Sequence, residues 1–362
     1  MEERKDLYKL ADTIISQCPL KSDIGLCLGE SCEGRPIYGF CLGSGPLRIS
    51  IISGCHADEP VGSLLLTRLV KFLGSLESDH SLLTHYQWWI VPHINPDGQE
   101  RNKGWQDVGD GIGLADVYDP ALYFSHVKRE LPGQDLEFGF PRSKDDPGVR
   151  PESRAVEEWW RNADGPFHIH ATLHGIALAG GPWFLLEPEW LERVEHVKSC
   201  CAEETSNLGY VLHDVDRKGD KGFHRIAPGF CTRPSSMEMQ DYFLPIGDED
   251  TATLFRPNSM ESIRSLGGDP LTLVSEMPLF ITPGVGKVLG PPDPVAEKWK
   301  HLRAHWELLL RGGIPLSEEK RELISKEIRN SGLKPMPIID QMRLQWRLVS
   351  AGIEQVIINN GT

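Results

Sequence analysis

The sequence predicts a three-layer α/β/α fold in which a mixed, mostly parallel sheet is flanked by helices. Two observations carry this prediction. Apolar runs typical of strands covered on both faces alternate with amphipathic segments of helical spacing. The 362 residues, 40% of them hydrophobic, are enough to bury one large core. We therefore expect one large domain over residues 1–314, followed by a helical extension over residues 315–362.

The individual elements follow from local patterns. Near-continuous apolar runs predict strands at residues 35–43, 48–56, 86–95, 167–175, 209–215 and 271–280. Amphipathic spacing predicts helices after Glu59, over 151–163 and 187–204, and from a Pro-rich hinge at 289–294 to about Arg311. Residues 102–150, rich in Gly, Pro and Asp, predict a long irregular excursion. Amphipathic stretches at 317–330 and 338–352 form the expected extension, which could pack on the domain or hold a homo-oligomer together.

Charge and cysteine content exclude several classes of protein. The net charge is −14 and no Lys- or Arg-rich run is present, which argues against nucleic-acid and membrane partners. No apolar run reaches 18 residues, and the charged N-terminus has no signal-peptide core, so we expect a soluble chain that is not exported. The eight cysteines form no CxxC pair, which is typical of reduced thiols in the cytoplasm.

Histidines at two strand ends are candidate metal ligands. His56 ends an apolar run, and Glu59 follows three residues later, where both can face one ion, although this spacing alone equally fits a capping pair. His174 closes a second β-rich run and would complete the three protein ligands of a catalytic zinc site with an open fourth position. His168 and His170 alternate with His174, so spacing does not exclude them, but a strand histidine is more often structural.

A carboxylate and a guanidinium are candidate catalytic groups. Glu276 interrupts an apolar run, and a carboxylate in a core strand is costly unless it is paired or functional. Beside a zinc ion it could act as a general base, and the alternative is a solvent-facing residue at the sheet edge. Arg101 follows the Asn95–Gly98 turn and could stabilise negative charge on a substrate oxygen, or form an exposed ion pair.

Taken in order, eight segments resemble those of the zinc carboxypeptidase family, the carboxypeptidase A-like enzymes. They are GESCEGRPIYGF, SGCHADEPVG, NPDG, DLEFGFP, PESRAVEEW, TLHG, SSMEMQDYF and TLVSEMP. The resemblance spans about Gly29 to Arg311, and no single motif decides it. It implies a carboxypeptidase-like α/β/α fold and hydrolysis of a peptide or amide bond with one Zn²⁺ per chain.

The same resemblance assigns roles to individual residues. It implies that His56, Glu59 and His174 hold the zinc and that Glu276 is the general base, which then protonates the departing nitrogen. It also implies a cation that stabilises the developing oxyanion, for which Arg101 is the candidate.

The substrate pocket departs from the family pattern. Where the family carries an Asn-Arg pair that binds the terminal carboxylate of the substrate, this chain has Glu137 and Phe138, and Phe230 stands where the family often has a tyrosine. A phenyl ring cannot bind a carboxylate and a glutamate repels one. Either another arginine binds it, or the substrate presents a different group, such as an amine that Glu137 would meet. The candidate arginines are Arg142, Arg150 and Arg233.

We therefore expect a zinc-dependent hydrolase of unusual specificity that acts on a peptide, a peptidoglycan fragment or an amino-acid conjugate. Two alternatives stay open. N-acyl amino-acid deacylases of the aspartoacylase and succinylglutamate desuccinylase type share the HxxE start, although they tend to keep an Asn-Arg pair and lack the Gly-Arg-Pro approach. A catalytically inactive zinc-binding protein is the other alternative, but it would not need Glu276.

Overall fold

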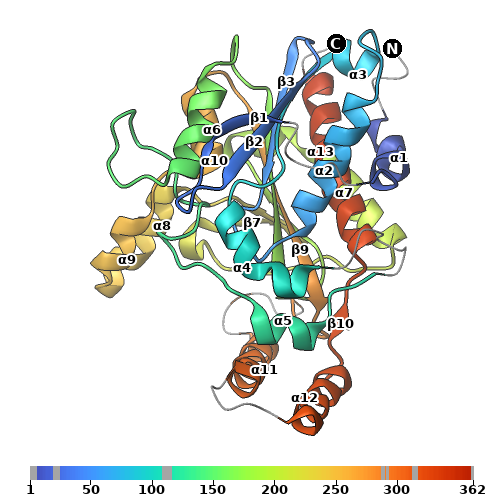
Figure 1. Ribbon diagram of the computed structural model, residues 1–362, viewed down its shortest axis with the longest axis vertical. Helices are drawn as coiled ribbons and strands as arrows, with labels where there is room; N and C mark the ends of the chain where they lie inside the picture. Colours follow the sequence, from blue (N-terminus) through green and yellow to red (C-terminus); the bar gives the residue numbers. More distant parts are fainter. Residues whose placement is uncertain are drawn as a thin grey trace.

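The computed structural model describes residues 6–18, 25–107, 116–286, 290, 293–311 and 317–359. Within these ranges, a ten-stranded mixed sheet forms the middle layer, in the order β1-β2-β4-β3-β5-β9-β6-β8-β7, with β10 paired to β9 (Figure 1). The strands are β1 Leu26–Glu30, β2 Pro36–Leu42, β3 Leu47–Ser53, β4 Tyr86–Val91, β5 Ile169–Ala179, β6 Trp183–Leu186, β7 Arg225–Ala227, β8 Phe230–Thr232, β9 Leu271–Ile281 and β10 Lys334–Pro335. The four central strands, β4, β3, β5 and β9, are mutually parallel. The predicted α/β/α class is confirmed.

Helices cover both faces of this sheet. They are α1 Ala11–Ile15, α2 Val61–Gly74, α3 Ser81–Thr84, α4 Pro96–Gln106, α5 Pro120–His126, α6 Pro151–Arg161, α7 Glu195–Asn207, α8 Ser236–Phe243, α9 Glu249–Leu254, α10 Ser259–Ser265, α11 Pro294–Arg311, α12 Glu318–Asn330 and α13 Ile338–Asn359. The face under α2, α7 and α13 holds the larger core, and α6 and α10 close the smaller core on the other face. In the part of the chain described, no helix is long and apolar enough to cross a membrane.

The last helix belongs to the main domain. α13 is buried along most of its length and packs on α2, α7 and β9, and its Trp346 stacks on Trp88 of β4 at a centroid distance of 6.4 Å. Of the two placements left open for the predicted extension, α13 takes the one on the domain. The sequence pattern could not choose between them, because an amphipathic helix has the same pattern on a subunit surface and on a sheet face.

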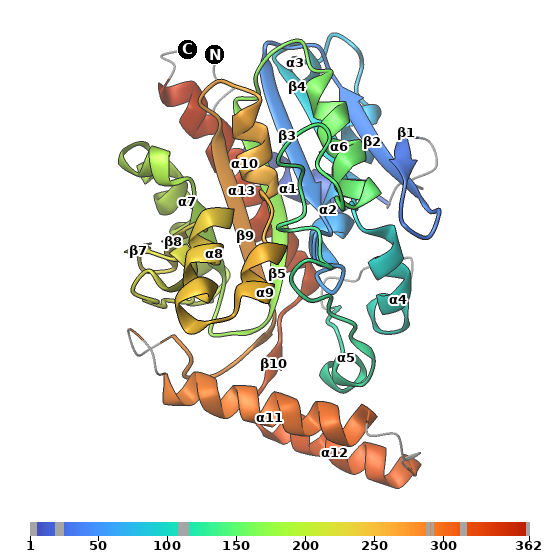
Figure 2. The ribbon, with the colours of Figure 1, turned by 90° about the vertical axis from the view of Figure 1, so that its left-hand side faces the viewer.

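The helices α11 and α12 lie side by side at the lower end of the molecule, next to α5 (Figure 2). Leu308 and Leu323 on these helices are 70% and 67% exposed. A homo-oligomer that uses this end of the chain stays a prediction.

One predicted strand is absent. Residues 209–215 run without strand pairing, although His213 N donates to the Pro182 carbonyl and Gly180 N donates to the His213 ring. His213 is buried although it lies in a loop. An apolar run in the sequence does not by itself show whether the buried segment is a strand or a loop. The excursion 102–150 contains the end of α4, the short α5 and a long irregular segment.

Candidate active site

The predicted metal ligands meet where β3 ends beside the middle of β5. These strands are parallel neighbours, and Ser53, the last residue of β3, pairs with Leu173, so the chain just beyond β3 lies beside His174 within β5. Gly54 turns the chain out of β3 with a φ of 79°, and a Cβ there would lie 2.7 Å from the ring of His93. The segment that follows carries His56 to His174, in the middle of β5.

Glu59 links the two imidazoles. Its backbone N–H donates to the His56 carbonyl at 3.2 Å, which holds the turn before α2. Its carboxylate oxygens lie 3.0 Å from His56 Nδ1 and 2.9 Å from His174 Nδ1, and the two rings are 5.1 Å apart. Gly175 N–H also donates to this carboxylate at 3.1 Å. Two imidazole nitrogens and a carboxylate that converge in this way form a donor set that zinc accepts.

The electrostatics of the cluster favour positive charge between these three residues. Burial alone would lower the pKa of His56, but the adjacent Glu59 raises it to about 9. Burial also opposes the charged form of His174, whose pKa is nevertheless well above its usual value because carboxylates, Glu137 first, surround it. Burial would raise the pKa of Glu59, but the two imidazoles hold it below its ordinary range. A divalent cation could supply the charge that the protons otherwise carry.

Glu276 joins this cluster from β9. In the parallel ladder between β5 and β9, Glu276 pairs directly with His174, so both side chains leave the same face of the sheet. Burial and the negative charge of Glu59 raise the pKa of Glu276 to about 8. In the metal-free chain, the carboxyl group therefore holds a proton at neutral pH. Glu276 and His56 line the same cavity of about 260 Å³.

Arg129 lines this cavity, whereas the predicted Arg101 does not. Arg101 pairs with Glu33 and, at 3.1 Å, with Glu130, and it does not line the cavity of the imidazoles. Arg129 does, and its guanidinium lies 3.2 Å from Asp58 and 3.4 Å from Glu59. Arg129 could not be predicted from periodicity, because it lies in an irregular segment. Its position shortly before DLEFGFP, one of the segments that resemble the family, is the sequence feature that could have indicated it.

Of the predicted substrate-binding residues, Glu137 and Phe138 line the cavity. Phe138 packs edge to face on Phe255 with ring centroids 5.3 Å apart. Phe230 does not line it, because it is buried in β8 and stacks on Phe184 of β6.

The candidate arginines for a substrate carboxylate are all bound elsewhere, and none lines this cavity. Their partners are the Phe255 carbonyl for Arg142, Glu152 for Arg150 and Glu187 for Arg233. Arg233 is only 6% exposed, so its ion pair is part of the core. The structure therefore does not bring these arginines to the cluster of imidazoles.

His170 is a structural histidine. Its ring lies between the hydroxyls of Ser50 and Ser259, 3.0 Å from each, and burial lowers its pKa to about 3. The unfolded chain takes up this proton near pH 6.5, so between pH 6.5 and 3 the unfolded state binds more protons and the free energy of unfolding falls as the pH falls.

This gives a testable pH dependence. Between pH 6.5 and 4.5, His170 is expected to remove about 2 kcal/mol from the free energy of unfolding of the metal-free protein. Urea unfolding in chelator at several pH values measures it, and His170→Gln should lose less stability over this window by that amount. Equal pH slopes in the two proteins would contradict the assignment.

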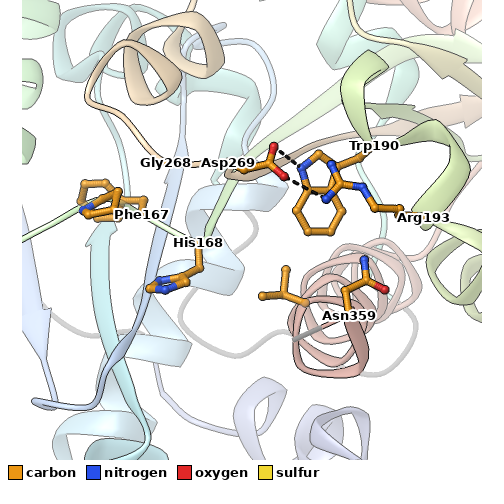
Figure 3. A pocket seen from close by; sticks show the side chains of 9 residues that line it. Phe167, His168, Trp190, Arg193, Gly268, Asp269 and Asn359 are labelled. Atoms are coloured by element: carbon orange, nitrogen blue, oxygen red, sulfur yellow. Dashed lines mark hydrogen bonds and ion pairs between the residues drawn. The ribbon is translucent and has the colours of Figure 1, made fainter. Parts of the chain in front are cut away.

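A larger cavity, of about 540 Å³, lies at the opposite edge of the sheet, before β5 and β9 begin (Figure 3). Asp269 accepts hydrogen bonds there from Trp190 at 3.0 Å and from Arg193 at 2.8 Å, as the dashed lines in Figure 3 show. The polar groups of Asp269, Trp190 and Arg193 are thus already hydrogen-bonded to one another. The smaller cavity beside His56 is therefore the better candidate for an active site.

A second group of potential ligands lies between α7 and α13. His196 and Cys200 are four residues apart on α7, and His196 Nε2 lies 2.8 Å from a carboxylate oxygen of Glu354. The same oxygen is 3.9 Å from the guanidinium of Arg347. A fixed cation so close opposes a metal ion, and we interpret this group as a polar contact that joins the two helices.

Part of this chain is similar to a known family of zinc enzymes. Residues 8–180 match the family model described as zinc carboxypeptidase. Over this range the chain is similar to the zinc carboxypeptidase family. The matched range contains His56, Glu59, Arg129 and His174, whereas Glu276 lies beyond it.

Relatives with this family name are distant and longer. The chain is 29% identical to Carboxypeptidase SOL1 of Arabidopsis thaliana over 190 residues, which are 49% of this chain and 34% of that protein. It is 26% identical to Carboxypeptidase D of Mus musculus over 253 residues, 62% of this chain and 16% of the relative. The chain thus spans about a third or less of these curated relatives. A metallo-carboxypeptidase from Burkholderia cenocepacia is similar with a TM-score of 0.45 at 14% identity, covering 100% of this chain and 70% of that one.

Proposed function

We propose that this chain is a zinc-dependent hydrolase that cleaves a peptide or amide bond and whose substrate carries no free carboxylate on the leaving group. The observation that supports it is one cavity that His56 of the imidazole cluster and Glu276 both line. Among the described residues, the one arginine that lines it, Arg129, is paired with Asp58 and Glu59. The match of residues 8–180 to the zinc carboxypeptidase family model supports the reaction class. The cavity lining supports the unusual specificity.

The donor set fits a zinc ion, which His56, Glu59 and His174 would hold. When bound, zinc would supply a Lewis acid that polarises the scissile carbonyl and acidifies water. Glu276, paired in register with His174, is placed to take a proton from the attacking water and to return it to the departing nitrogen. Beside bound zinc, the pKa of Glu276 would fall from its raised value in the metal-free chain, which favours the carboxylate that accepts the proton.

Arg129 is the group that would face negative charge developing on the substrate oxygen. Its guanidinium lines the cavity and is partly neutralised by Asp58 and Glu59, which hold its position. Arg101 is separated from this role by its ion pairs with Glu33 and Glu130.

The remainder of the cavity disfavours a substrate carboxylate. Its other charged residues are acidic, namely Glu130, Asp135 and Glu137, and burial raises the pKa of Asp135 to about 6. Its uncharged wall is apolar and includes Phe138, Leu185, Phe223, Pro234, Met239 and Phe255. A carboxylate bound there would be desolvated beside like charges. An uncharged, apolar leaving group suits this lining, as in a C-terminally amidated peptide or an amide conjugate.

Product analysis by mass spectrometry tests the proposal. Zinc-loaded protein would be incubated with peptides synthesised in pairs, with a free or an amidated C-terminus, together with acyl-amino acids and muropeptides. We expect the amidated member of a pair with an apolar last residue to be cleaved at least about tenfold faster, a difference of about 1.4 kcal/mol in the barrier. Exclusive cleavage of free C-termini would refute the specificity. No cleavage by a protein that binds zinc stoichiometrically would refute the hydrolase.

A double substitution probes the pocket directly. Glu137→Asn with Phe138→Arg removes the negative charge and adds a guanidinium that can bind a carboxylate. The ratio of kcat/KM for free over amidated peptides should rise at least about tenfold. Glu137→Asn with Phe138→Leu is the matched control, because it removes the same charge and ring without adding a cation. If both double variants shift the ratio equally, the added guanidinium does not bind the carboxylate.

We also propose a reducing compartment for this chain. All eight cysteines are free, and four of them are buried, which supports this location without identifying the compartment.

A further inference from the structure

Glu137 approaches the same two imidazoles as Glu59. Its Oε2 lies 3.4 Å from His56 Nε2 and 3.4 Å from His174 Nδ1. The oxygen is thus within ligand distance of both histidines, and the three side chains by themselves form a group that could hold a metal ion. At His174 Nδ1 the two glutamates converge on one nitrogen, since Glu59 is 2.9 Å from it.

Nothing else in the described part of the chain accounts for this position. The Glu137 carboxylate is 15% exposed, and among the described residues it accepts no hydrogen bond and pairs with no lysine or arginine. A mostly buried carboxylate without hydrogen bonds is costly, and Glu59 and Glu276 add like charge beside it. The group therefore needs positive charge beside it, from protonated imidazoles or from a bound cation.

The distances fit a shared metal ion better than a hydrogen bond. Zinc holds nitrogen and carboxylate oxygen at about 2.0 to 2.2 Å, so two ligand atoms of a tetrahedral site lie about 3.3 to 3.5 Å apart. The contact of Glu137 with His174 Nδ1, at 3.4 Å, matches this spacing on the nitrogen that also faces Glu59, whereas its 3.4 Å contact with His56 is to Nε2 and not to the Nδ1 that faces Glu59. The 3.4 Å separations are longer than the usual N–H···O distance of about 2.9 Å.

We propose that Glu137 is a fourth protein ligand of the metal ion, so that the resting site is closed by His56, Glu59, His174 and this carboxylate. The inference rests on the proposed zinc site and deepens it. A closed set of four ligands binds the ion tightly and leaves no open position, so a substrate must displace one of them. Glu137 is the candidate for displacement, because it lies in an irregular segment and, among the described residues, its carboxylate forms no ion pair or hydrogen bond beyond those two imidazoles, whereas Glu59 is held by Gly175 N–H.

Metal affinity and coordination test the inference without reference to turnover. Metal-free protein would be titrated with Zn²⁺ against a chromophoric chelator, and with Co²⁺ while its visible absorption is recorded. We expect Glu137→Gln to weaken Zn²⁺ binding at least about tenfold and to change the cobalt spectrum toward that of a site with one more solvent ligand. Glu137→Asp, which keeps a carboxylate, should retain more of the affinity than Glu137→Gln.

Glu130→Gln is the matched control. It removes one negative charge from the same cavity at a residue that does not contact the imidazoles, so it separates ligation from a general loss of negative field. Unchanged affinity and spectrum in Glu137→Gln, or an equal loss in Glu130→Gln, would overturn the inference while leaving the zinc site intact. Failure of the parent protein to bind Zn²⁺ would instead refute the proposed function. Thermal unfolding of the metal-free proteins checks that each variant folds, and Glu137→Asn serves if Glu137→Gln does not.

Discussion

Replacing Glu276 with glutamine should lower kcat by about 10²- to 10⁴-fold while the affinity for zinc changes little. Glutamine has the same shape and keeps hydrogen-bonding capacity, but it cannot exchange a proton with water or with the departing nitrogen. The His174 and Glu276 pairing in the β5–β9 ladder places this carboxyl beside the metal cluster without making it one of the ligands. Initial rates with the best substrate of the peptide library and zinc titration of both proteins measure the two quantities.

Glu157→Gln is the control for this variant. Glu157 is also buried, at 3% exposed, but it lies on α6 in an ion pair with Arg161 and outside the cavity. We expect Glu157→Gln to keep its activity, because the substitution changes a buried carboxylate without touching the site. A Glu276→Gln enzyme with more than about a tenth of the parental kcat would remove Glu276 from the reaction.

Replacing His174 with alanine should weaken zinc binding by more than about 100-fold and abolish turnover at ordinary zinc concentrations. Loss of a residue that merely supports a metal ligand typically costs 10- to 100-fold in affinity, and loss of a ligand costs more. The substitution also leaves Glu59 with one imidazole fewer in a buried site, which disfavours its charged form. Competition with a chromophoric chelator measures the affinity.

His168→Ala is the matched control, since this imidazole precedes the same strand but faces Arg48, whose backbone N–H it accepts at 3.0 Å. Zinc affinity should stay within a few fold of the parent in this variant. If His174→Ala bound zinc as tightly as the parent protein, the assignment of the metal site would be wrong. An equal loss in both variants would show that damage to β5, and not loss of a ligand, reduces binding.

The sequence by itself determined the part of this protein that follows from regular local patterns. The apolar runs that became β3, β5 and β9 predicted a parallel core, and the rule that sites lie at the carboxyl ends of such strands pointed to His56 and His174. Glu276 stood out because a carboxylate in an apolar run is costly. Each of these inferences needs only the pattern of apolar residues that marks a strand and the end of the strand at which a residue lies.

Only the tertiary structure decided the features that depend on contacts between distant segments. These features are the position of Arg129 at the cavity, the approach of Glu137 to both imidazoles, and the burial of Arg233. All three involve side chains whose partners are far away in the sequence or whose segment has no period. The placement of α13 against the sheet is of the same kind. The physical reason is that hydrophobic patterning specifies which face of an element is buried but not what buries it, and ion pairs in irregular segments leave no periodic trace in the sequence.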